Sequence, residues 1–206
     1  KIFVQGIQYD NKSSFQKGPK QAPPIIREVL HCGSLNLCAE NGISIENSTI
    51  EDKGDFEISE YFDIENITRT HLDMCSKIFT LGGDHSMTLP ILRSIAKKHG
   101  PVALVHVDAH ADVNDEMFGE KETHGTVFRR AYEEGLIVPE MVFQIGLRGT
   151  GYTADDFTEA ADWGFTQYLA PSLWHKSLSP LAKDIRQQIG DTPTYITYDI
   201  DSLDPS

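Results

Sequence analysis

Short apolar or β-branched runs alternate along this chain with segments whose apolar residues recur at helical spacing. The runs predict strands at residues 2–7, 79–81, 102–107, 141–145, 165–169 and 195–200. The segments between them predict helices at residues 24–30, 67–77, 88–99, 126–134, 154–163 and 180–189. Residues 44–60 are too weakly patterned for an assignment.

Residues at the ends of these segments support the predicted helices. Gly100 and Gly190 stand where a helix C-terminus favours a left-handed residue, and Ser179 before Pro180 is typical of a helix start. The alternation of strands and helices indicates an α/β fold with a doubly wound, mainly parallel sheet and helices on both faces. With 206 residues, 39% of them hydrophobic, we expect a single domain spanning residues 1–206.

The composition indicates which kinds of partner the protein binds and in which cellular compartment it resides. The formal net charge is −13 and no long block of Lys and Arg is present, which argues against a nucleic-acid partner. No apolar stretch approaches the roughly 18 residues of a membrane span, so we expect no membrane association. Cys32, Cys38 and Cys75 are odd in number and lack metal-ligand spacing, which favours a reduced, cytoplasmic setting.

Three clusters of carboxylates and histidines follow apolar runs. They are Gly82-Gly83-Asp84-His85, Asp108-Ala109-His110-Ala111-Asp112 and Asp199-Ile200-Asp201. In an extended strand, the first, third and fifth residues of the second cluster would project to one side, and the two aspartates of the third would share a face. Ligands of open α/β sheets bind beyond the carboxyl ends of strands, where all three clusters fall.

Such a gathering of carboxylates and imidazoles is typical of a metal site, because burying these groups without a cation is costly. Oxygen and imidazole donors without cysteine favour an ion such as Mn²⁺. Six ligands suit two ions about 3.5–4 Å apart that hold a hydroxide between them. A single Asp-x-Asp, however, is more often a turn or a helix cap than a metal ligand.

These motifs resemble those of the ureohydrolases, the arginase and agmatinase superfamily. Its signatures are Gly-Gly-Asp-His, Asp-Ala-His-x-Asp and a strand ending in Asp-x-Asp-x-x-Asp-Pro, and the last stands here as Asp199-Ile200-Asp201-Ser202-Leu203-Asp204-Pro205. The resemblance implies an arginase-like three-layer α/β/α fold and two Mn²⁺ per subunit. It makes His85 and Asp112 ligands of one ion, His110 and Asp201 ligands of the other, and Asp108 and Asp199 the bridges.

Within this superfamily, the segment from Asn114 to Lys121 and the His124-Gly125-Thr126 that follows it resemble the agmatinase and guanidinobutyrase branch. The resemblance implies hydrolysis of agmatine to putrescine and urea, with Asp112 as the proton donor to the departing nitrogen. It makes His124 a proton shuttle or substrate contact. From the loop of residues 117–121 we select Met117 as the specificity residue, although loops of this composition are usually just solvated. His106 is in phase with Asp108, but a hydrogen-bonded core histidine is the more common role at such a position.

Two alternatives to agmatine hydrolysis stay open. One is hydrolysis of a linear guanidino acid such as 4-guanidinobutyrate, and the other is a non-catalytic metal-binding fragment or assembly protein. The family continues beyond its aspartate-proline signature into another strand and a glutamate that binds the guanidinium, whereas this chain stops at Ser206. We therefore expect a fragment truncated at its C-terminus, with exposed strand edges. The family also implies trimers or hexamers.

Overall fold

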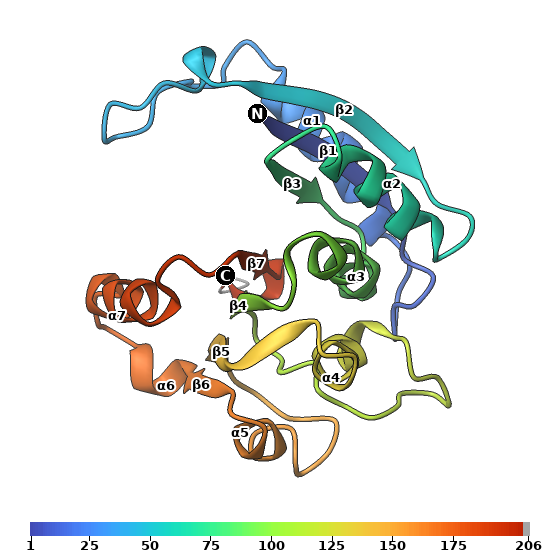
Figure 1. Cartoon of the computed structure of the whole chain (residues 1–206), viewed down its shortest axis with the longest axis vertical. Helices are drawn as coiled ribbons and strands as arrows, with labels where there is room; N and C mark the ends of the chain where they lie inside the picture. The colour runs from blue at the N-terminus through green and yellow to red at the C-terminus, as the bar shows by residue number, and fades with distance from the viewer. Residues whose placement is uncertain (204–206) are drawn as a thin grey trace. The chain divides into compact units, whose positions relative to one another are not determined.

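The computed structural model describes residues 1–203. By its internal contacts the chain divides into two compact units, Lys1–Ser94 and Ile95–Ser206 (Figure 1). Each unit contains one sheet in which all strand pairs are parallel. The expected single domain stays a prediction.

The first unit has a three-stranded sheet in the order β2-β1-β3. Its strands are β1 (Ile2–Gln8), β2 (Ile50–Glu57) and β3 (Lys77–Leu81), and its helices are α1 (Ala22–Leu30) and α2 (Asp63–Leu72). Successive residues of β1 point to opposite faces, so Phe3 packs edge-on against His71 of α2, while Gly6 lies beside Pro23 of α1. Helices therefore cover both faces of this sheet.

A buried polar network joins the strands of the first unit to α2. Gln5 is fully buried, and its Nε2 donates to Thr68 Oγ1 at 3.3 Å and to Thr80 Oγ1 at 3.1 Å. Its Oε1 lies 2.6 Å from His71 Nδ1, which therefore donates. All the hydrogen-bonding atoms of the Gln5 amide thus contact protein partners, as burial requires.

The second unit has a four-stranded sheet in the order β6-β5-β4-β7. Its strands are β4 (Val102–Val107), β5 (Ile137–Leu147), β6 (Thr166–Leu169) and β7 (Thr194–Tyr198), and its helices are α4 (Val127–Glu133), α5 (Glu159–Asp162), α6 (Ala170–Leu173) and α7 (Ser179–Ile189). Helix α3 (Thr88–His99) contains the boundary between the units.

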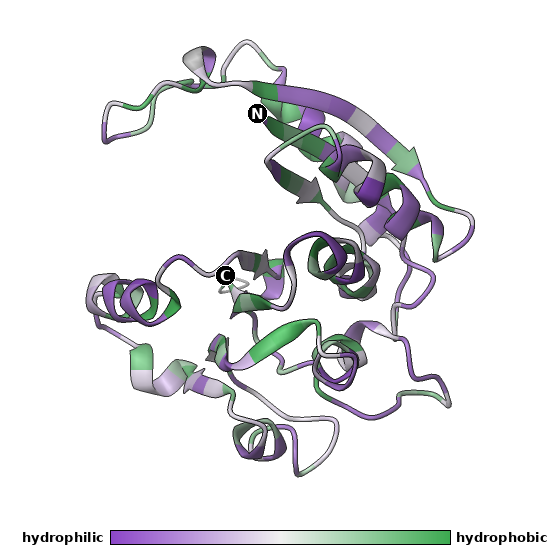
Figure 2. Cartoon of the chain, viewed as in Figure 1, coloured by the Kyte–Doolittle hydropathy of each residue, from purple (hydrophilic) through white to green (hydrophobic). Residues whose placement is uncertain are grey.

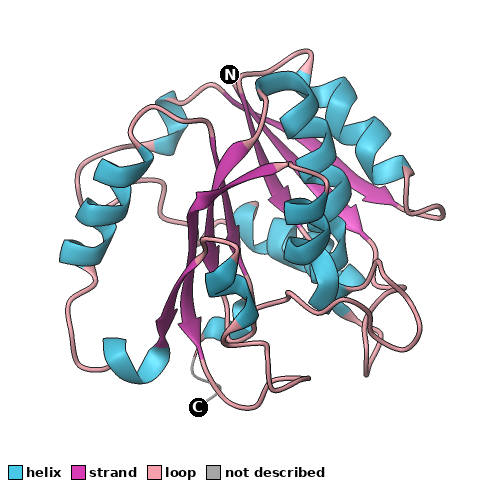
Figure 3. Cartoon of the chain, turned by 60° about the horizontal axis from the view of Figure 1, so that its bottom comes forward, coloured by secondary structure: helices cyan, strands magenta, loops and turns pink. Residues whose placement is uncertain are grey.

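Helices lie on both sides of this second sheet as well (Figure 3). On one face, Ile185 and Ile189 of α7 pack with Ala103 of β4 and Phe143 of β5 in a buried core. On the other face, Phe128 of α4 packs against His106 of β4, with ring centroids 4.2 Å apart. The predicted α/β fold with parallel strands and helices on both faces is confirmed, although the strands form two sheets.

The main differences between the sequence-based elements and the structure lie in β2, α5 and α2; in addition, α6 has no counterpart among the predicted elements and β7 ends two residues earlier than expected. Strand β2 lies within the unassigned residues 44–60, and it is coloured largely as hydrophilic in Figure 2. The helix expected at residues 154–163 shrinks to α5, because Asp156 instead accepts hydrogen bonds from the Tyr152 and Thr153 N–H groups in a turn. The helix expected at residues 67–77 lies earlier, at Asp63–Leu72.

The predicted helix ends are largely confirmed. Gly100 has a φ of 79° and Gly190 a φ of 57°, so both adopt the left-handed region that favours glycine. Ser179 is the first residue of α7 and makes no cap through its side chain, because Leu178 takes the cap position. Within the described residues, β3 and β7 each form the edge of their sheet, with Phe79 and Ile196 exposed.

Candidate metal centre

The segment after β4 departs from the strand on which the alternation argument depended. Strand β4 ends at Val107, and the residues from Asp108 onwards are bends or irregular. Asp112 has a φ of 54°, a left-handed conformation that non-glycine residues rarely adopt. The expected one-sided projection of Asp108, His110 and Asp112 from a strand is therefore wrong, and a turn brings these side chains together instead.

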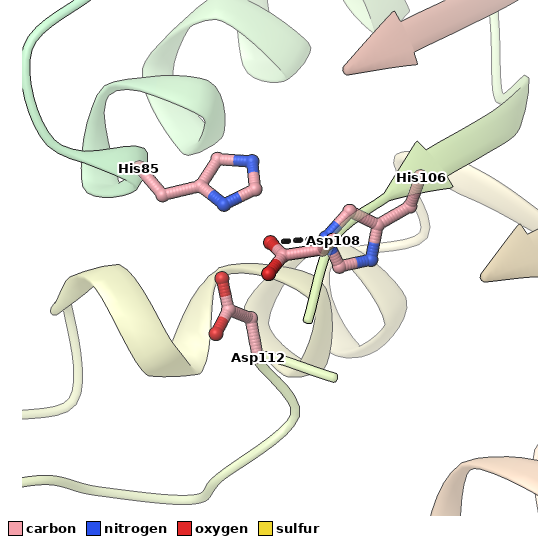
Figure 4. Close-up of side chains that lie close together, drawn as sticks. All are labelled: His85, His106, Asp108 and Asp112. Carbon is pink, nitrogen blue, oxygen red and sulfur yellow. Dashed lines mark hydrogen bonds and ion pairs between the residues drawn. The ribbon is translucent and has the colours of Figure 1, made fainter. Parts of the chain in front are cut away.

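Asp108 lies at the centre of this turn and is almost fully buried. Its Oδ2 lies 2.7 Å from His106 Nε2 (Figure 4), and its Oδ1 accepts a hydrogen bond from the His110 N–H at 2.7 Å. His106 is thus the hydrogen-bonded core histidine that the sequence favours, and it also contacts the site. These two contacts, one to each oxygen, fix the orientation of the Asp108 carboxylate.

Asp112 brings a second buried carboxylate to the same place. One Asp112 carboxylate oxygen lies within 4.8 Å of an Asp108 carboxylate oxygen and of a ring nitrogen of His106. The carboxylate of Asp112 points towards that of Asp108 in Figure 4. The Asp112 carbonyl accepts the Phe128 N–H of α4 at 3.0 Å, which anchors the turn to that helix.

A second group of ligand atoms combines Asp108 with His110 and Asp201, again within 4.8 Å of one another. His110 Nδ1 lies 3.6 Å from Asp108 Oδ1 and 3.0 Å from Asp201 Oδ2. The carboxylates of Asp108 and Asp201 together raise the pKa of the exposed His110 imidazole to about 10. Asp108 belongs to both groups, which is the position that the resemblance implies for a bridge.

Asp199 and Asp201 do not share the face of a strand as expected, because β7 ends at Tyr198. Asp199 caps the 3₁₀-helix Ile200–Ser202, and its Oδ1 accepts the Asp201 N–H at 3.0 Å. Neither of the two groups of ligand atoms found in residues 1–203 includes Asp199. Its role as a bridge therefore stays a prediction. Asp204 lies outside the described residues.

His85 belongs to the first unit, where it begins the 3₁₀-helix His85–Met87 after β3. Asp84 caps this helix and accepts hydrogen bonds from the Ser86 N–H at 2.9 Å and the Lys12 N–H at 3.1 Å. A Cβ on Gly83 would lie 1.8 Å from the Tyr9 carbonyl oxygen. The Gly-Gly-Asp-His motif therefore permits close backbone contact around His85.

The two predicted substrate contacts lie in the loops that follow Asp112. His124 is half-buried and begins the 3₁₀-helix His124–Thr126. Met117 is buried, and its sulfur would lie 2.3 Å from a Cβ added to Gly125. The structure thus gives Met117 a packing role in the loop, while its part in specificity stays a prediction, as does the contact of His124 with substrate.

The donor atoms present suit a divalent cation. Two buried carboxylates within 4.8 Å of each other repel unless a proton or a cation lies between them. Carboxylate oxygens with imidazole nitrogens and no thiolate suit Mn²⁺ better than structural zinc. One further residue, Gln144 of β5, has no distinguishing sequence pattern, yet it donates to the Ala111 carbonyl at 2.7 Å in the turn between Asp108 and Asp112.

Comparison with known proteins agrees with this geometry. The family model described as "Arginase family" matches residues 1–206, and the chain belongs to that family. It is 44% identical over 208 residues to the guanidinobutyrase of Pseudomonas aeruginosa, covering 98% of this chain and 65% of that protein. It is 40% identical over 208 residues to the mitochondrial agmatinase of Gallus gallus, covering 98% of this chain and 61% of that protein.

The fold also resembles that of a solved relative. The proclavaminate amidinohydrolase of Streptomyces clavuligerus superposes with a TM-score of 0.85 at 31% identity, covering 99% of this chain and 70% of that chain. The chain thus spans about two thirds of the length of these relatives. Within residues 1–203, no helix has the length and apolar character needed to cross a membrane.

Proposed function

We propose that this chain carries the metal-binding part of an amidinohydrolase, which hydrolyses the guanidinium of a linear substrate to an amine and urea. The observation that carries the proposal is the convergence of Asp108 with Asp112 and with His110 and Asp201, in a chain of the arginase family. The buried Asp108 belongs to both groups of ligand atoms. This sharing supports two ions rather than one.

Two Mn²⁺ ions would be held by the residues that the family motifs assign. His85 and Asp112 would bind one ion, His110 and Asp201 the other, and Asp108 and Asp199 would bridge them. When bound, such a pair lowers the pKa of a water molecule and stabilises the charge that develops at the attacked carbon. Asp199 Oδ1 also accepts the Asp201 N–H, and the remaining lone pairs of its carboxylate would be available to the ions.

The proton transfers fall to side chains of the chain itself. Asp112, beside Asp108, would take up a proton from the attacking water and pass it to the departing nitrogen, and without this proton the amine would leave as a poor anionic leaving group. His124, in the loop that follows Asp112, would exchange protons with solvent. Both residues lie in the second unit, on the segments that follow the carboxyl end of β4.

The charge of a cavity in the second unit supports agmatine as the substrate, with putrescine and urea as products. The cavity has a volume of about 520 Å³ and is lined by Val113, which directly follows Asp112, but by none of the proposed metal ligands. Its lining includes five carboxylates against the single guanidinium of Arg129; the five are Asp115, Glu116, Asp155, Asp156 and Glu159. A negative lining favours the ammonium tail of agmatine over a carboxylate tail.

The identity to a guanidinobutyrase favours a second candidate, 4-guanidinobutyrate. The two substrates separate in a direct test, because agmatine has an ammonium at the end where the acid has a carboxylate. Urea release should be measured for both with the whole protein and Mn²⁺. A higher kcat/KM for agmatine supports the first substrate and a higher value for the acid the second. Metal binding without urea from either would favour the non-catalytic alternative.

Assembly and setting form part of the same proposal. Homotrimers or homohexamers are implied by the family resemblance, and size-exclusion chromatography with light scattering tests them. The free thiols of Cys32, Cys38 and Cys75 support a reduced cytoplasmic setting. The proposed partners are therefore a small guanidino substrate and further copies of the chain.

A further inference from the structure

A row of polar side chains crosses the sheet of the second unit. The strand register places His106 of β4 beside Gln144 of β5, and Gln144 beside Gln167 of β6. His106 and Gln144 are fully buried. Polar groups in such a place are costly unless their hydrogen bonds are made, so each polar atom of this row requires a partner.

The amide of Gln144 has one orientation that satisfies its neighbours. Its Nε2 donates to the Ala111 carbonyl at 2.7 Å and lies 3.0 Å from His106 Nδ1, while its Oε1 accepts from Gln167 Nε2 at 2.8 Å. In the reversed orientation, the amide oxygen of Gln144 would face the carbonyl oxygen of Ala111. Because a carbonyl oxygen only accepts hydrogen bonds, that orientation is excluded.

This orientation also selects the tautomer of His106. With Nδ1 accepting the second hydrogen of the Gln144 amide, the ring proton stands on Nε2. Nε2 then donates to Asp108 Oδ2 at 2.7 Å. Each side chain therefore donates a hydrogen bond to the next: Gln167 to Gln144, Gln144 to His106, and His106 to Asp108.

We infer that Gln144 is a positioning residue of the metal centre. One amide group fixes the histidine tautomer that orients Asp108, and it also holds the carbonyl immediately before Asp112. The left-handed φ of 54° at Asp112 makes outside support for this turn necessary. The metal role of Gln144 rests on the proposed function, whereas its hydrogen-bond geometry does not.

The test is the affinity of the whole protein for Mn²⁺, measured by the electron paramagnetic resonance signal of free Mn²⁺. Gln144→Met keeps the approximate volume and removes both donors, and Gln144→Glu keeps the shape and replaces the donor with an acceptor. Loss of a hydrogen-bonding partner behind a ligand weakens metal binding about 10–100-fold, so we expect losses in that range for both variants.

Gln5 offers a matched control in the first unit. It is also a fully buried glutamine that hydrogen-bonds to a buried histidine, His71, which is not a proposed ligand. Gln5→Met should lower thermal stability about as much as Gln144→Met, while its affinity for Mn²⁺ stays at the wild-type value. An equal loss of affinity in the Gln5 and Gln144 variants would overturn the inference, because general destabilisation would then explain both.

A second readout needs neither metal nor a variant. Nitrogen-15 chemical shifts of the metal-free protein report which nitrogen of His106 carries the proton, and we expect Nε2. A proton on Nδ1 would overturn the inference and leave the proposed function standing. Wild-type affinity in Gln144→Glu would do the same, whereas a wild-type protein that binds no Mn²⁺ would overturn both the inference and the proposed function.

Discussion

Arg148, just beyond the end of β5, donates to the Asp201 carbonyl at 2.7 Å and to the Leu203 carbonyl at 3.0 Å. Its own N–H donates to the Ala109 carbonyl at 2.9 Å. One residue thereby joins the turn after β4 to the segment after β7. Because these two segments contain His110 and Asp201, Arg148 sets the distance between two proposed metal ligands.

Replacing Arg148 should therefore weaken the centre without removing a ligand. We expect Arg148→Met to lower the free energy of unfolding by about 1–3 kcal/mol and the affinity for Mn²⁺ about 10-fold or more. Arg148→Lys keeps the charge but loses the planar set of donors, so its affinity for Mn²⁺ should lie between those of the wild type and Arg148→Met. Isothermal titration with Mn²⁺ checks this order, and wild-type affinity in Arg148→Met would contradict it.

Asp112 combines a strained backbone with a proposed chemical role, and two variants separate them. Asparagine tolerates the left-handed region and alanine does not, so Asp112→Ala should lose about 1–2 kcal/mol of stability from backbone strain. Asp112→Asn should unfold near the wild-type temperature and still lose urea release at least 100-fold, since it provides neither an acid nor a charged metal ligand. Near-normal turnover in Asp112→Asn would remove Asp112 from the proposed proton transfer.

The second glycine of the Gly-Gly-Asp-His motif should tolerate no side chain. A Cβ at Gly83 would meet the backbone oxygen of Tyr9 at 1.8 Å, so the backbone must shift. We expect Gly83→Ala to lower the free energy of unfolding by about 2–3 kcal/mol. Gly33→Ala is the control, because nothing lies within 4 Å of a Cβ there. Chemical denaturation of both variants compares them, and equal stability would contradict the close contact.

Stability should fall in mild acid because of His71. Burial, and then the nearby charge of Lys53, hold the pKa of His71 below its ordinary value of 6.5. The unfolded chain therefore binds the proton more readily, so the contribution of neutral His71 is complete above pH 6.5 and is lost as the pH falls below it. Urea denaturation at pH 7.5 and at pH 5.5 measures this loss in the free energy of unfolding. The difference between the two pH values should be smaller in His71→Gln than in the wild type.

The elements with strong apolar patterns were predictable from the sequence. Residues 102–107 and 88–99 coincide with β4 and α3, because continuous apolar runs and helical spacing follow directly from burial. Strand β2 lacks such a pattern, since none of its described side chains is fully buried and it lies at the edge of its sheet. Edge strands carry polar residues that resemble those of loops.

The candidate centre was predictable in composition but not in geometry. The motifs identified Asp108, His110 and Asp201, and the structure brings them together. The left-handed Asp112 and the cap formed by Asp199 depend on local backbone turns, which strand alternation does not describe. Gln144 has no sequence signal at all, because only the register of neighbouring strands places it beside His106.

Release of urea by the manganese-loaded whole protein tests the central claim most directly. Agmatine and 4-guanidinobutyrate should each be incubated with the wild type, with Asp108→Asn, and with Asp162→Asn as a control that changes an exposed carboxylate at the end of α5. The proposed two-metal hydrolase predicts urea from at least one substrate with the wild type and the control, and none with Asp108→Asn. No urea from the wild type, or undiminished release by Asp108→Asn, would contradict it.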